Sequence, residues 1–347
     1  MLAARFKVGG QPFSVDDIEV PKVGVEDVLV EVKVAGLCGT DVHYRRGEFE
    51  TDRVPLVLGH EGAGIVKEIG NNVTHVKPGD KVVVHYVISC GHCNPCLRGQ
   101  DNRCRNRLTI GHSVDGTFAE YVKIPGRSAI KMPDGVPIEY GAITACAVST
   151  AFHALNVSGI EKGEDVVIFG LGGVGLHAVM WAKFYGAGRI IAVDPIDSKL
   201  ETAQRYGADI LVNPSKTDAV ELIRKATEGW GADVVIECSG SHKAMEQAVK
   251  AIKGKNQFHS GTLVSVGLQT QPWQVEYWGF REGWLTVSGD HTRFELNQIL
   301  KLIALGRIDL SRSITHRISL GQIDEGIELL ESNKEHVEKV VIDMTKR

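Results

Sequence analysis

The sequence contains no long apolar run and no cluster of basic residues. Its longest apolar stretches are far shorter than the roughly 20 residues that a membrane-spanning helix needs. Lys and Arg number 39 and Asp and Glu 43, a formal net charge of −4, so no electrostatic footprint for nucleic acid is present. The first residues, Met1 to Lys7, lack the apolar segment of a signal peptide. We therefore expect a cytoplasmic protein with no nucleic acid or membrane partner.

The chain has no low-complexity tract, tandem repeat or long linker, and it is long enough for two domains. At about 150 residues per domain, 347 residues suggest two globular bodies, and 43% hydrophobic residues suffice for their cores. The seven cysteines are unevenly spread, because four of them lie between Cys90 and Cys104. Without a secretion signal, such a cluster favours metal binding over a disulfide framework.

Residues 1–150 have the texture of a β-rich domain. Short β-branched and partly alternating segments are separated by Gly and Pro, as in the turn signal at 76–80, and they predict strands near 28–34, 64–69 and 81–85. Many short strands favour an antiparallel, barrel-like body.

From about residue 151 the texture changes to alternating strands and helices. Buried-strand patterns at 165–170, 189–194, 209–212, 232–237 and 261–267 alternate with helical patterns at 174–185 and from 198 onward. This alternation predicts an α/β fold with a doubly wound parallel sheet over 151–289. Residues 290–347 then predict two amphipathic helices and a final strand at 339–342, too short to fold alone, and we expect this segment to return to the first domain.

A glycine-rich segment, Gly170-Leu171-Gly172-Gly173-Val174-Gly175, matches the dinucleotide fingerprint. It follows a predicted strand, opens a predicted helix, and precedes Asp194, which lies 19 residues after Gly175 at the end of the next strand. The helix N-terminus would receive the pyrophosphate, and Asp194 would accept hydrogen bonds from the ribose and repel a 2′-phosphate. The motif therefore favours NAD, whereas Lys199, five residues after Asp194, keeps NADP open.

The spacing Cys90-x2-Cys93-x2-Cys96-x7-Cys104 predicts a structural zinc site of four thiolates. The first three cysteines also fit the start of a ferredoxin motif. That motif, however, requires its fourth cysteine three residues later and before Pro, whereas Cys104 follows after seven residues and precedes Arg105. A disulfide pair remains the other alternative.

Three further segments complete a family resemblance. They are Gly36-Leu37-Cys38-Gly39-Thr40-Asp41-Val42-His43, Leu58-Gly59-His60-Glu61-Gly62, and the stretch 145–150 around Cys146. Singly, a Cys or His is more often a packed or solvated side chain. Together with the cysteine cluster, the glycine-rich loop and Glu237-Cys238-Ser239-Gly240, they make the chain resemble the zinc-dependent medium-chain alcohol dehydrogenases, from about Val28 to the C-terminus.

The resemblance implies a β-rich GroES-like catalytic domain, a Rossmann domain, and a catalytic zinc held by Cys38, His60 and Cys146. It implies reversible hydride transfer between an alcohol or ketone and NAD(P), with zinc acting as a Lewis acid. Glu61 and Asp41 match carboxylates that support the ligands. Thr40 and His43 match the family's proton relay, and the alternative for His43 is a surface histidine at a helix start.

The resemblance also assigns residues to the cofactor and the substrate. Thr150, Val174, Gly267 and Leu268 match residues around the nicotinamide, and Lys339 stands where many members carry an Arg near the cofactor. Gly39 departs from the Arg or His that several members place against the pyrophosphate, which leaves the choice between NAD and NADP open. Phe49 and Tyr86 map to pocket-lining positions and favour an apolar or aromatic alcohol, although core packing would equally explain them.

The length is typical of the shorter members of the family, which are commonly tetramers, and we expect a homotetramer. Trp273, Trp278 and Trp284 would line the site or a subunit interface. The alternatives are a polyol or threonine-type dehydrogenase of the same family, against which Cys146 argues, and a catalytically silent nucleotide-binding relative, which predicts disrupted ligands. A zinc-free enoyl or quinone reductase would lack the cysteine cluster, Cys38 and His60.

Overall fold

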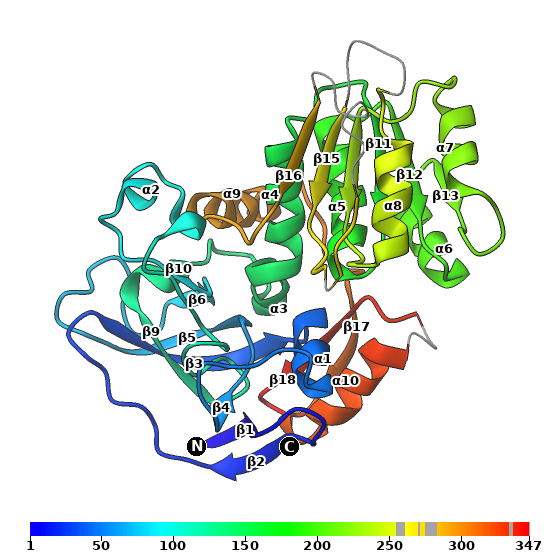
Figure 1. Ribbon diagram of the computed structural model, residues 1–347. Helices are drawn as coiled ribbons and strands as arrows, with labels where there is room; N and C mark the ends of the chain where they lie inside the picture. Colours follow the sequence, from blue (N-terminus) through cyan, green and yellow to red (C-terminus); the bar gives the residue numbers. More distant parts are fainter. Residues whose placement is uncertain (255–260, 270, 275–282, 333–335, 347) are drawn as a thin grey trace. The chain divides into compact units, whose positions relative to one another are not determined.

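The computed structural model describes residues 1–254, 261–269, 271–274, 283–332 and 336–346. The chain folds as two compact units (Figure 1). Unit 1 comprises Met1–Ser149 and Asp290–Arg347, and unit 2 comprises Thr150–Gly289. Of the three tryptophans singled out in the sequence, Trp278 lies outside the described residues.

Unit 1 is mainly antiparallel β-structure. Its largest sheet has the strand order β10-β6-β5-β3-β18-β17, with β9 also paired to β3; β2-β1-β4 and β7-β8 form smaller sheets. The strands are β1 (Leu2–Phe6), β2 (Ser14–Asp17), β3 (Asp27–Gly36), β4 (Leu56–Val57), β5 (Glu61–Ile69), β6 (Lys81–Val84), β7 (Val87–Ile88), β8 (Leu108–Thr109), β9 (Tyr121–Pro125), β10 (Ala129–Lys131), β17 (Ile314–Ile318) and β18 (Lys339–Asp343).

The helices of unit 1 lie in the connections between its strands. They are α1 (Gly39–Arg46), α2 (Asn94–Leu97), α3 (Ile138–Ile143), the π-helical turn η3 (Thr144–Val148), α9 (Arg293–Ala304), α10 (Ile323–Ser332) and the 3-10 turns η1 (Asp101–Arg103), η2 (Gly126–Ser128) and η5 (Leu320–Gln322). The sequence patterns did not predict α1, η3 or β17. The helical segments α1 and η3 are too short for a periodic signal to stand out.

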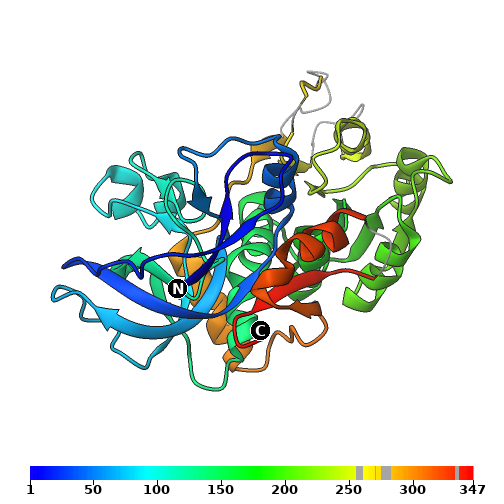
Figure 2. The ribbon, with the colours of Figure 1, turned by 90° about the horizontal axis from the view of Figure 1, so that it is seen from below.

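The C-terminal segment completes the large sheet of unit 1. Strand β18 pairs antiparallel with β3, with Ile342 opposite Ala35, and β17 pairs parallel with β18. Helix α10 packs against α1 and carries ion pairs to it, Arg45–Asp324 at 3.0 Å and Arg46–Glu331 at 2.8 Å. Both chain ends lie at the lower edge of this unit in Figure 1 and face the viewer in Figure 2. Residues 290–347 therefore belong structurally to unit 1.

Unit 2 is a parallel six-stranded sheet with the order β13-β12-β11-β14-β15-β16. The order reverses between β11 and β14, and helices α5 and α8, which follow these two strands, lie on opposite faces as right-handed crossovers require (Figure 1). The strands are β11 (Asp165–Phe169), β12 (Arg189–Val193), β13 (Ile210–Val212), β14 (Val234–Glu237), β15 (Thr262–Ser265) and β16 (Trp284–Val287). The helices are α4 (Ser149–Ser158), α5 (Gly173–Tyr185), α6 (Asp197–Tyr206), α7 (Ala219–Ala226) and α8 (His242–Ala251).

The fold class predicted from the sequence is confirmed: a doubly wound parallel sheet accompanies a β-rich unit. The core of unit 2 consists of buried aliphatic side chains of the central strands, such as Val167, Ile191 and Val235, and α8 contributes Met245 to it. No helix in the described ranges combines the length and the apolar character that a membrane crossing requires.

Candidate active site

Four side chains far apart in the sequence meet in unit 1. Cys38 lies at the N-cap of α1, His60 directly precedes β5, Glu61 is the first residue of β5, and Cys146 lies in the π-helical turn η3. One ligand atom from each lies within 4.8 Å of the others. Three elements that are neighbours only in the folded unit therefore bring together the two sulfurs, the imidazole and the carboxylate. We call these four residues, candidate ligands of the catalytic metal that the resemblance implies, the catalytic cluster.

The catalytic cluster favours a thiolate beside an imidazole. A hydrogen bond with Cys146 and the nearby His60 lower the pKa of the Cys38 thiol, against the opposing effect of burial. Burial would lower the pKa of His60, yet the negative Cys38 raises it to about 9. Negative sulfur next to imidazole nitrogen and a carboxylate is a donor set that suits zinc.

A buried carboxylate completes the candidate metal group. Burial raises the pKa of Glu61 to about 7, although Lys339 acts in the opposite direction. Lys339, the first residue of β18, donates from Nζ to Glu61 Oε1 and to the carbonyl oxygen of Leu37, both at 2.7 Å. Glu61 Oε2 forms an ion pair with the same Nζ at 2.7 Å, whereas Asp41 Oδ1 is buried and accepts no hydrogen bond from the described residues. The residues of the catalytic cluster therefore fit a bound zinc ion.

Two of the predicted supporting residues have contacts that the sequence did not show. Asp41 Oδ2 accepts the backbone N–H of Cys38 at 2.8 Å, which fixes the start of α1, and burial raises the pKa of its carboxyl to about 6. Its predicted role in orienting His60 stays a prediction. Lys339, expected at the cofactor, instead holds Glu61, and its contact with a cofactor also stays a prediction.

The relay candidates Thr40 and His43 lie on α1, one turn apart. Thr40 Oγ1 lies 3.8 Å from Cys38 Sγ. The ring of His43 stacks on Phe49, with centroids 4.8 Å apart, and its Nδ1 lies 2.5 Å from Glu48 Oε2. Glu48 reaches this position because α1 ends at Gly47, whose positive φ of 75° turns the chain back. Glu48 could not be assigned to the site from the sequence, since its contact with His43 depends on this cap.

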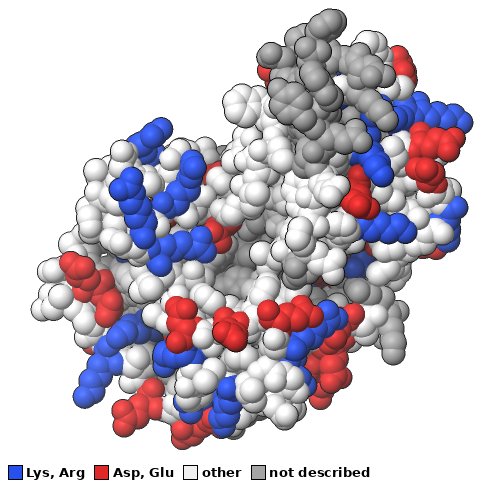
Figure 3. All heavy atoms as spheres, viewed as in Figure 1, with Lys and Arg blue, Asp and Glu red and all other residues white. Residues whose placement is uncertain are grey.

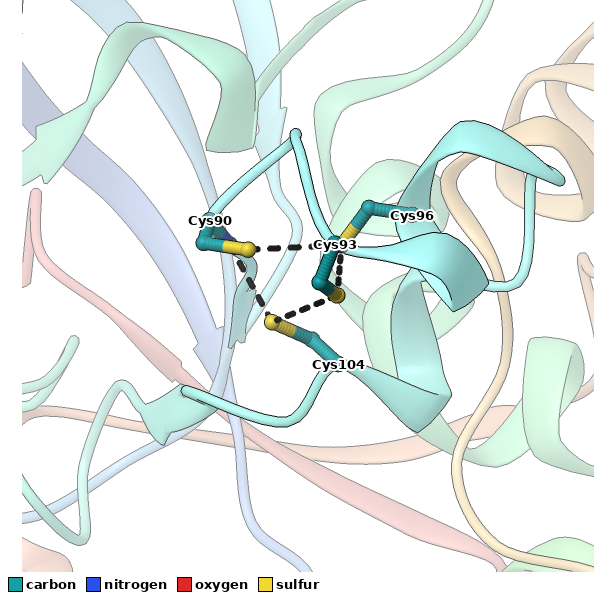
Figure 4. Close-up of side chains that lie close together, drawn as sticks. All are labelled: Cys90, Cys93, Cys96 and Cys104. Atoms are coloured by element: carbon teal, nitrogen blue, oxygen red, sulfur yellow. Dashed lines mark hydrogen bonds between the residues drawn. The ribbon is translucent and has the colours of Figure 1, made fainter.

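The four clustered cysteines form a second site, the cysteine lobe (Figure 4). Cys93 caps α2 and Cys96 lies within it, Cys90 follows β7, and Cys104 follows η1. The sulfur atoms lie 4.0 Å apart for Cys90–Cys96, 3.4 Å for Cys93–Cys96 and 3.9 Å for Cys93–Cys104. Bonds of about 2.3 Å in a tetrahedral zinc site place the sulfurs roughly 3.8 Å apart, so the lobe fits the metal.

Backbone amides donate hydrogen bonds to the sulfur atoms of the cysteine lobe and favour their thiolate form. Hydrogen bonds from the amides of Arg105 and Cys96 lower the pKa of the Cys93 thiol to about 6, which favours the thiolate that zinc binds. The amide of Cys90 also donates to Cys104 Sγ at 3.2 Å. All seven cysteines of the chain are free thiols, so none is committed to a disulfide.

In unit 2 the glycine-rich loop has the geometry of an anion site. Gly170 follows β11 with φ of 82°, and a Cβ at Gly175 would lie 1.8 Å from the Gly170 carbonyl oxygen, so the tight turn requires both glycines. Gly172 is the N-cap of α5, and a Cβ there would meet no atom within 4 Å. Open space at a helix N-terminus is where a phosphate binds. Gly173 and Val174 form the first turn of α5.

Asp194 fastens this loop to the end of β12. Its Oδ2 accepts the N–H of Leu171 at 2.8 Å and its Oδ1 accepts that of Ile196 at 2.9 Å, and the residue is only 5% exposed. Lys199 lies nearby on α6; burial lowers the pKa of its ammonium, and Asp194 acts in the opposite direction. The contact between Asp194 and the loop is a tertiary feature that the motif spacing did not predict.

The remaining cofactor candidates lie in the same unit. Thr150 is buried in the first turn of α4, whereas Gly267 and the exposed Leu268 follow β15. A Cβ at Gly267 would lie 2.1 Å from the Gly240 nitrogen and 2.9 Å from Glu237 Oε2, so the loops after β14 and β15 approach closely. Glu237 holds these loops together, because it accepts the amide of Ser239 at 2.7 Å and the Gln269 side chain at 2.8 Å. The carboxyl ends of the central strands therefore gather the predicted nucleotide residues.

Two family models match the chain. The model of the alcohol dehydrogenase GroES-like domain matches residues 24–134, and the model described as zinc-binding dehydrogenase matches residues 173–288. They cover much of unit 1 and most of unit 2.

Individual relatives agree over almost the whole length. An alcohol dehydrogenase of Geobacillus stearothermophilus is 37% identical over 312 residues, which cover 89% of this chain and 90% of the relative. An L-threonine 3-dehydrogenase of Bacillus licheniformis is 35% identical over 340 residues, 95% of each chain. Among solved structures, a zinc-binding dehydrogenase of Sinorhizobium meliloti bound to NADP has a TM-score of 0.88 and 34% identity, covering 99% of this chain and 98% of that one. The chain thus belongs to the zinc-dependent medium-chain alcohol dehydrogenase family and is an NAD(P)-dependent oxidoreductase.

Proposed function

We propose that the protein is an alcohol dehydrogenase or ketone reductase that transfers hydride reversibly between an alcohol and NAD. The observation that carries this proposal is the catalytic cluster, in which Cys38, His60 and Cys146 meet although 22 and 86 residues separate them in sequence. These three residues would hold a catalytic zinc, with Glu61 behind it, and the cysteine lobe would hold a structural zinc. Unit 1 would be the catalytic domain and unit 2 the dinucleotide-binding domain.

The residues of the chain would bind, orient and move protons around the reacting groups. When bound, zinc supplies Lewis acidity toward the substrate oxygen and the nicotinamide supplies the hydride acceptor. Thr40 would accept the hydroxyl proton of the alcohol while giving its own to His43. Glu48, at Nδ1 of His43, would fix the tautomer that leaves Nε2 free to accept, and His43 would release the proton to solvent. In ketone reduction the same protons move in the opposite direction.

NAD is the favoured nucleotide in this proposal. The buried carboxylate of Asp194 would receive the ribose hydroxyls and repel a 2′-phosphate, and Gly172 would leave the helix N-terminus open to the pyrophosphate. Thr150, Val174, Gly267 and Leu268 would surround the nicotinamide. NADP is the alternative nucleotide and is included in the activity assay, because Lys199 lies near Asp194 and a similar solved structure is bound to NADP.

The aromatic rings beside the site favour an apolar alcohol. Tyr86 packs edge-to-face on His60, with ring centroids 5.2 Å apart, and Phe49 stacks on His43. Several relatives are L-threonine 3-dehydrogenases, so threonine belongs among the test substrates.

The subunits would associate as a homotetramer. Strand β16 ends the described sheet of unit 2, and its side chains Trp284, Leu285 and Val287 are exposed. An apolar edge strand is a surface that a second copy can cover. Sedimentation velocity would distinguish a tetramer from a dimer or a monomer.

We also propose that the protein works in a reducing compartment, the cytoplasm being the expected one. Its seven free thiols and thiolate metal sites support this, since oxidation would remove the ligands.

The decisive experiment measures zinc per subunit together with alcohol oxidation. Wild-type protein is expected to hold two zinc ions and to oxidise short or aromatic alcohols faster with NAD than with NADP. Cys146→Ser should keep one zinc and lose activity, whereas the control Cys238→Ser, at a partly buried cysteine outside both metal groups, should keep two. One zinc in wild type, retained in Cys146→Ser, would contradict the proposal.

A further inference from the structure

Tyr86 is held at both ends inside unit 1. It lies between β6 and β7 and is 5% exposed. Its ring meets His60 of the catalytic cluster edge-to-face, with centroids 5.2 Å apart and an interplanar angle of 77°. Its hydroxyl donates a hydrogen bond to Asp290 Oδ1 at 2.9 Å. The carbon ring therefore lies against the catalytic cluster while the polar end is bound elsewhere.

Asp290 is itself fixed in position. Both terminal nitrogens of Arg107 donate to its carboxylate, Nη2 to Oδ1 at 3.1 Å and Nη1 to Oδ2. Arg107 in turn donates to Thr109 Oγ1 and, at 3.4 Å, to the carbonyl oxygen of Asn102. Asp290 has a φ of 60°, a left-handed conformation that an aspartate adopts at some cost. The hydrogen bonds with Arg107 and Tyr86 therefore fix this carboxylate in position.

The hydrogen bond from Tyr86 to Asp290 determines which part of the Tyr86 side chain a substrate could contact. A tyrosine hydroxyl has a single proton, and here a carboxylate binds it. With this proton engaged, the side chain has no donor left for a polar substrate, and its ring carbons are what remains beside His60.

We propose that Asp290 is a positioning residue for substrate specificity: it holds the Tyr86 hydroxyl away from the substrate, so that the site favours monofunctional alcohols over vicinal diols. This inference rests on the proposed alcohol dehydrogenase function. Releasing the hydroxyl would give the site a new donor for a second substrate hydroxyl. One net hydrogen bond corresponds to a change of about three- to tenfold in specificity.

The test compares two alcohols that differ by one hydroxyl, 2-butanol and 2,3-butanediol. The readout is the ratio of kcat/KM for the diol to kcat/KM for the mono-alcohol, measured with saturating NAD on zinc-loaded enzyme. Asp290→Ala is expected to raise this ratio about three- to tenfold, through a lower KM for the diol. Adding Tyr86→Phe to Asp290→Ala should return the ratio to the wild-type value, which a general structural defect would not do.

Two further variants keep the test decisive if Asp290→Ala folds poorly. Tyr86→Phe alone should leave the ratio unchanged, because its hydroxyl does not reach the substrate in the wild type. Asp16→Ala, which breaks another aspartate–arginine pair of unit 1, should also leave it unchanged. A selective loss of diol activity in Tyr86→Phe would overturn the proposal, as would an Asp290→Ala variant that is active with an unchanged ratio.

A spectroscopic readout separates failure of this inference from failure of the proposed function. The tyrosine Raman doublet reports whether a hydroxyl donates to a strong acceptor, and the difference between wild type and Tyr86→Phe isolates Tyr86. We expect a donor signature that disappears in the Asp290→Ala background. If the signature is present but no alcohol is oxidised with either nucleotide, the proposed function fails and this specificity role fails with it. If alcohols are oxidised but the signature is absent, only this inference fails.

Discussion

Replacing Lys339 by Met should strongly destabilise unit 1. The Lys339 and Glu61 side chains are 3% and 0% exposed, and the ammonium also donates to the carbonyl oxygen of Leu37. Met fills a similar volume without the charge. Lys339→Met would therefore leave a carboxylate and a carbonyl oxygen buried without this donor.

The expected loss follows from the burial of both partners. Breaking a buried ion pair by removing one partner costs about 3–5 kcal/mol, because the remaining charge is uncompensated. For a unit of roughly 200 residues, each kcal/mol lowers Tm by about 2–4 °C, so the shift should be roughly 6–20 °C. Lys339→Met combined with Glu61→Gln should recover most of this loss, since no buried charge is then left unpaired.

The assay is urea unfolding of the zinc-loaded protein followed by far-ultraviolet circular dichroism and by tryptophan fluorescence. All five tryptophans lie in the sequence range of unit 2, so the loss should appear in the circular dichroism transition and less in the fluorescence transition. Lys131→Met is the matched control. It breaks the Lys131–Asp80 pair, whose side chains are 53% and 11% exposed, and should cost less than about 1 kcal/mol.

Two results would refute this reasoning. One is a loss in Lys339→Met no larger than that in Lys131→Met. The other is a double variant that is no more stable than Lys339→Met alone, which would mean that lost packing and not an unpaired charge is responsible.

Three further predictions concern the cysteine lobe, unit 2 and the proton relay. Cys93→Ser should remove one zinc per subunit and lower Tm by several degrees, because thiolate ligation contributes to folding; unchanged zinc content by elemental analysis would contradict it. Burial raises the pKa of Glu237 above its ordinary 4.5. The folded protein therefore binds the Glu237 proton more tightly than the unfolded chain does. The stability that this proton contributes is complete below pH 4.5 and is lost as the pH rises through the raised pKa. Glu237→Gln should flatten this decline in urea midpoints followed by tryptophan fluorescence, and an unchanged slope would count against the assignment. Glu48→Gln should lower kcat for alcohol oxidation roughly tenfold and change the pH profile of kcat, with little change in KM. The control Glu50→Gln, at an exposed neighbour, should behave as wild type. If Glu48→Gln and wild type have equal kcat values across the pH range, Glu48 has no role in the relay.

The local motifs were predictable from the sequence because their chemistry depends on short spacing. Four cysteines within 15 residues can close one metal shell whatever surrounds them, and the structure brings their sulfurs to within 4.0 Å for the pairs described above. The glycine-rich loop between β11 and α5 is likewise a local turn. The strand and helix alternation of unit 2 followed from apolar periodicity, which is also a local property.

Tertiary structure alone decided the contacts between segments distant in sequence. Cys38, His60 and Cys146 could be grouped only through a family resemblance, since packing of α1, β5 and η3 in one unit brings them together. The return of β18 to β3 places Lys339 on Glu61, and the start of the returning segment places Asp290 on Tyr86 and Arg107. Neither periodicity nor spacing predicts such contacts, because each contact forms only when the fold of the whole unit brings two distant side chains together. The sequence by itself therefore determined the fold class and the local metal and nucleotide motifs, whereas the folded units decided which buried charges and hydroxyls support the catalytic cluster.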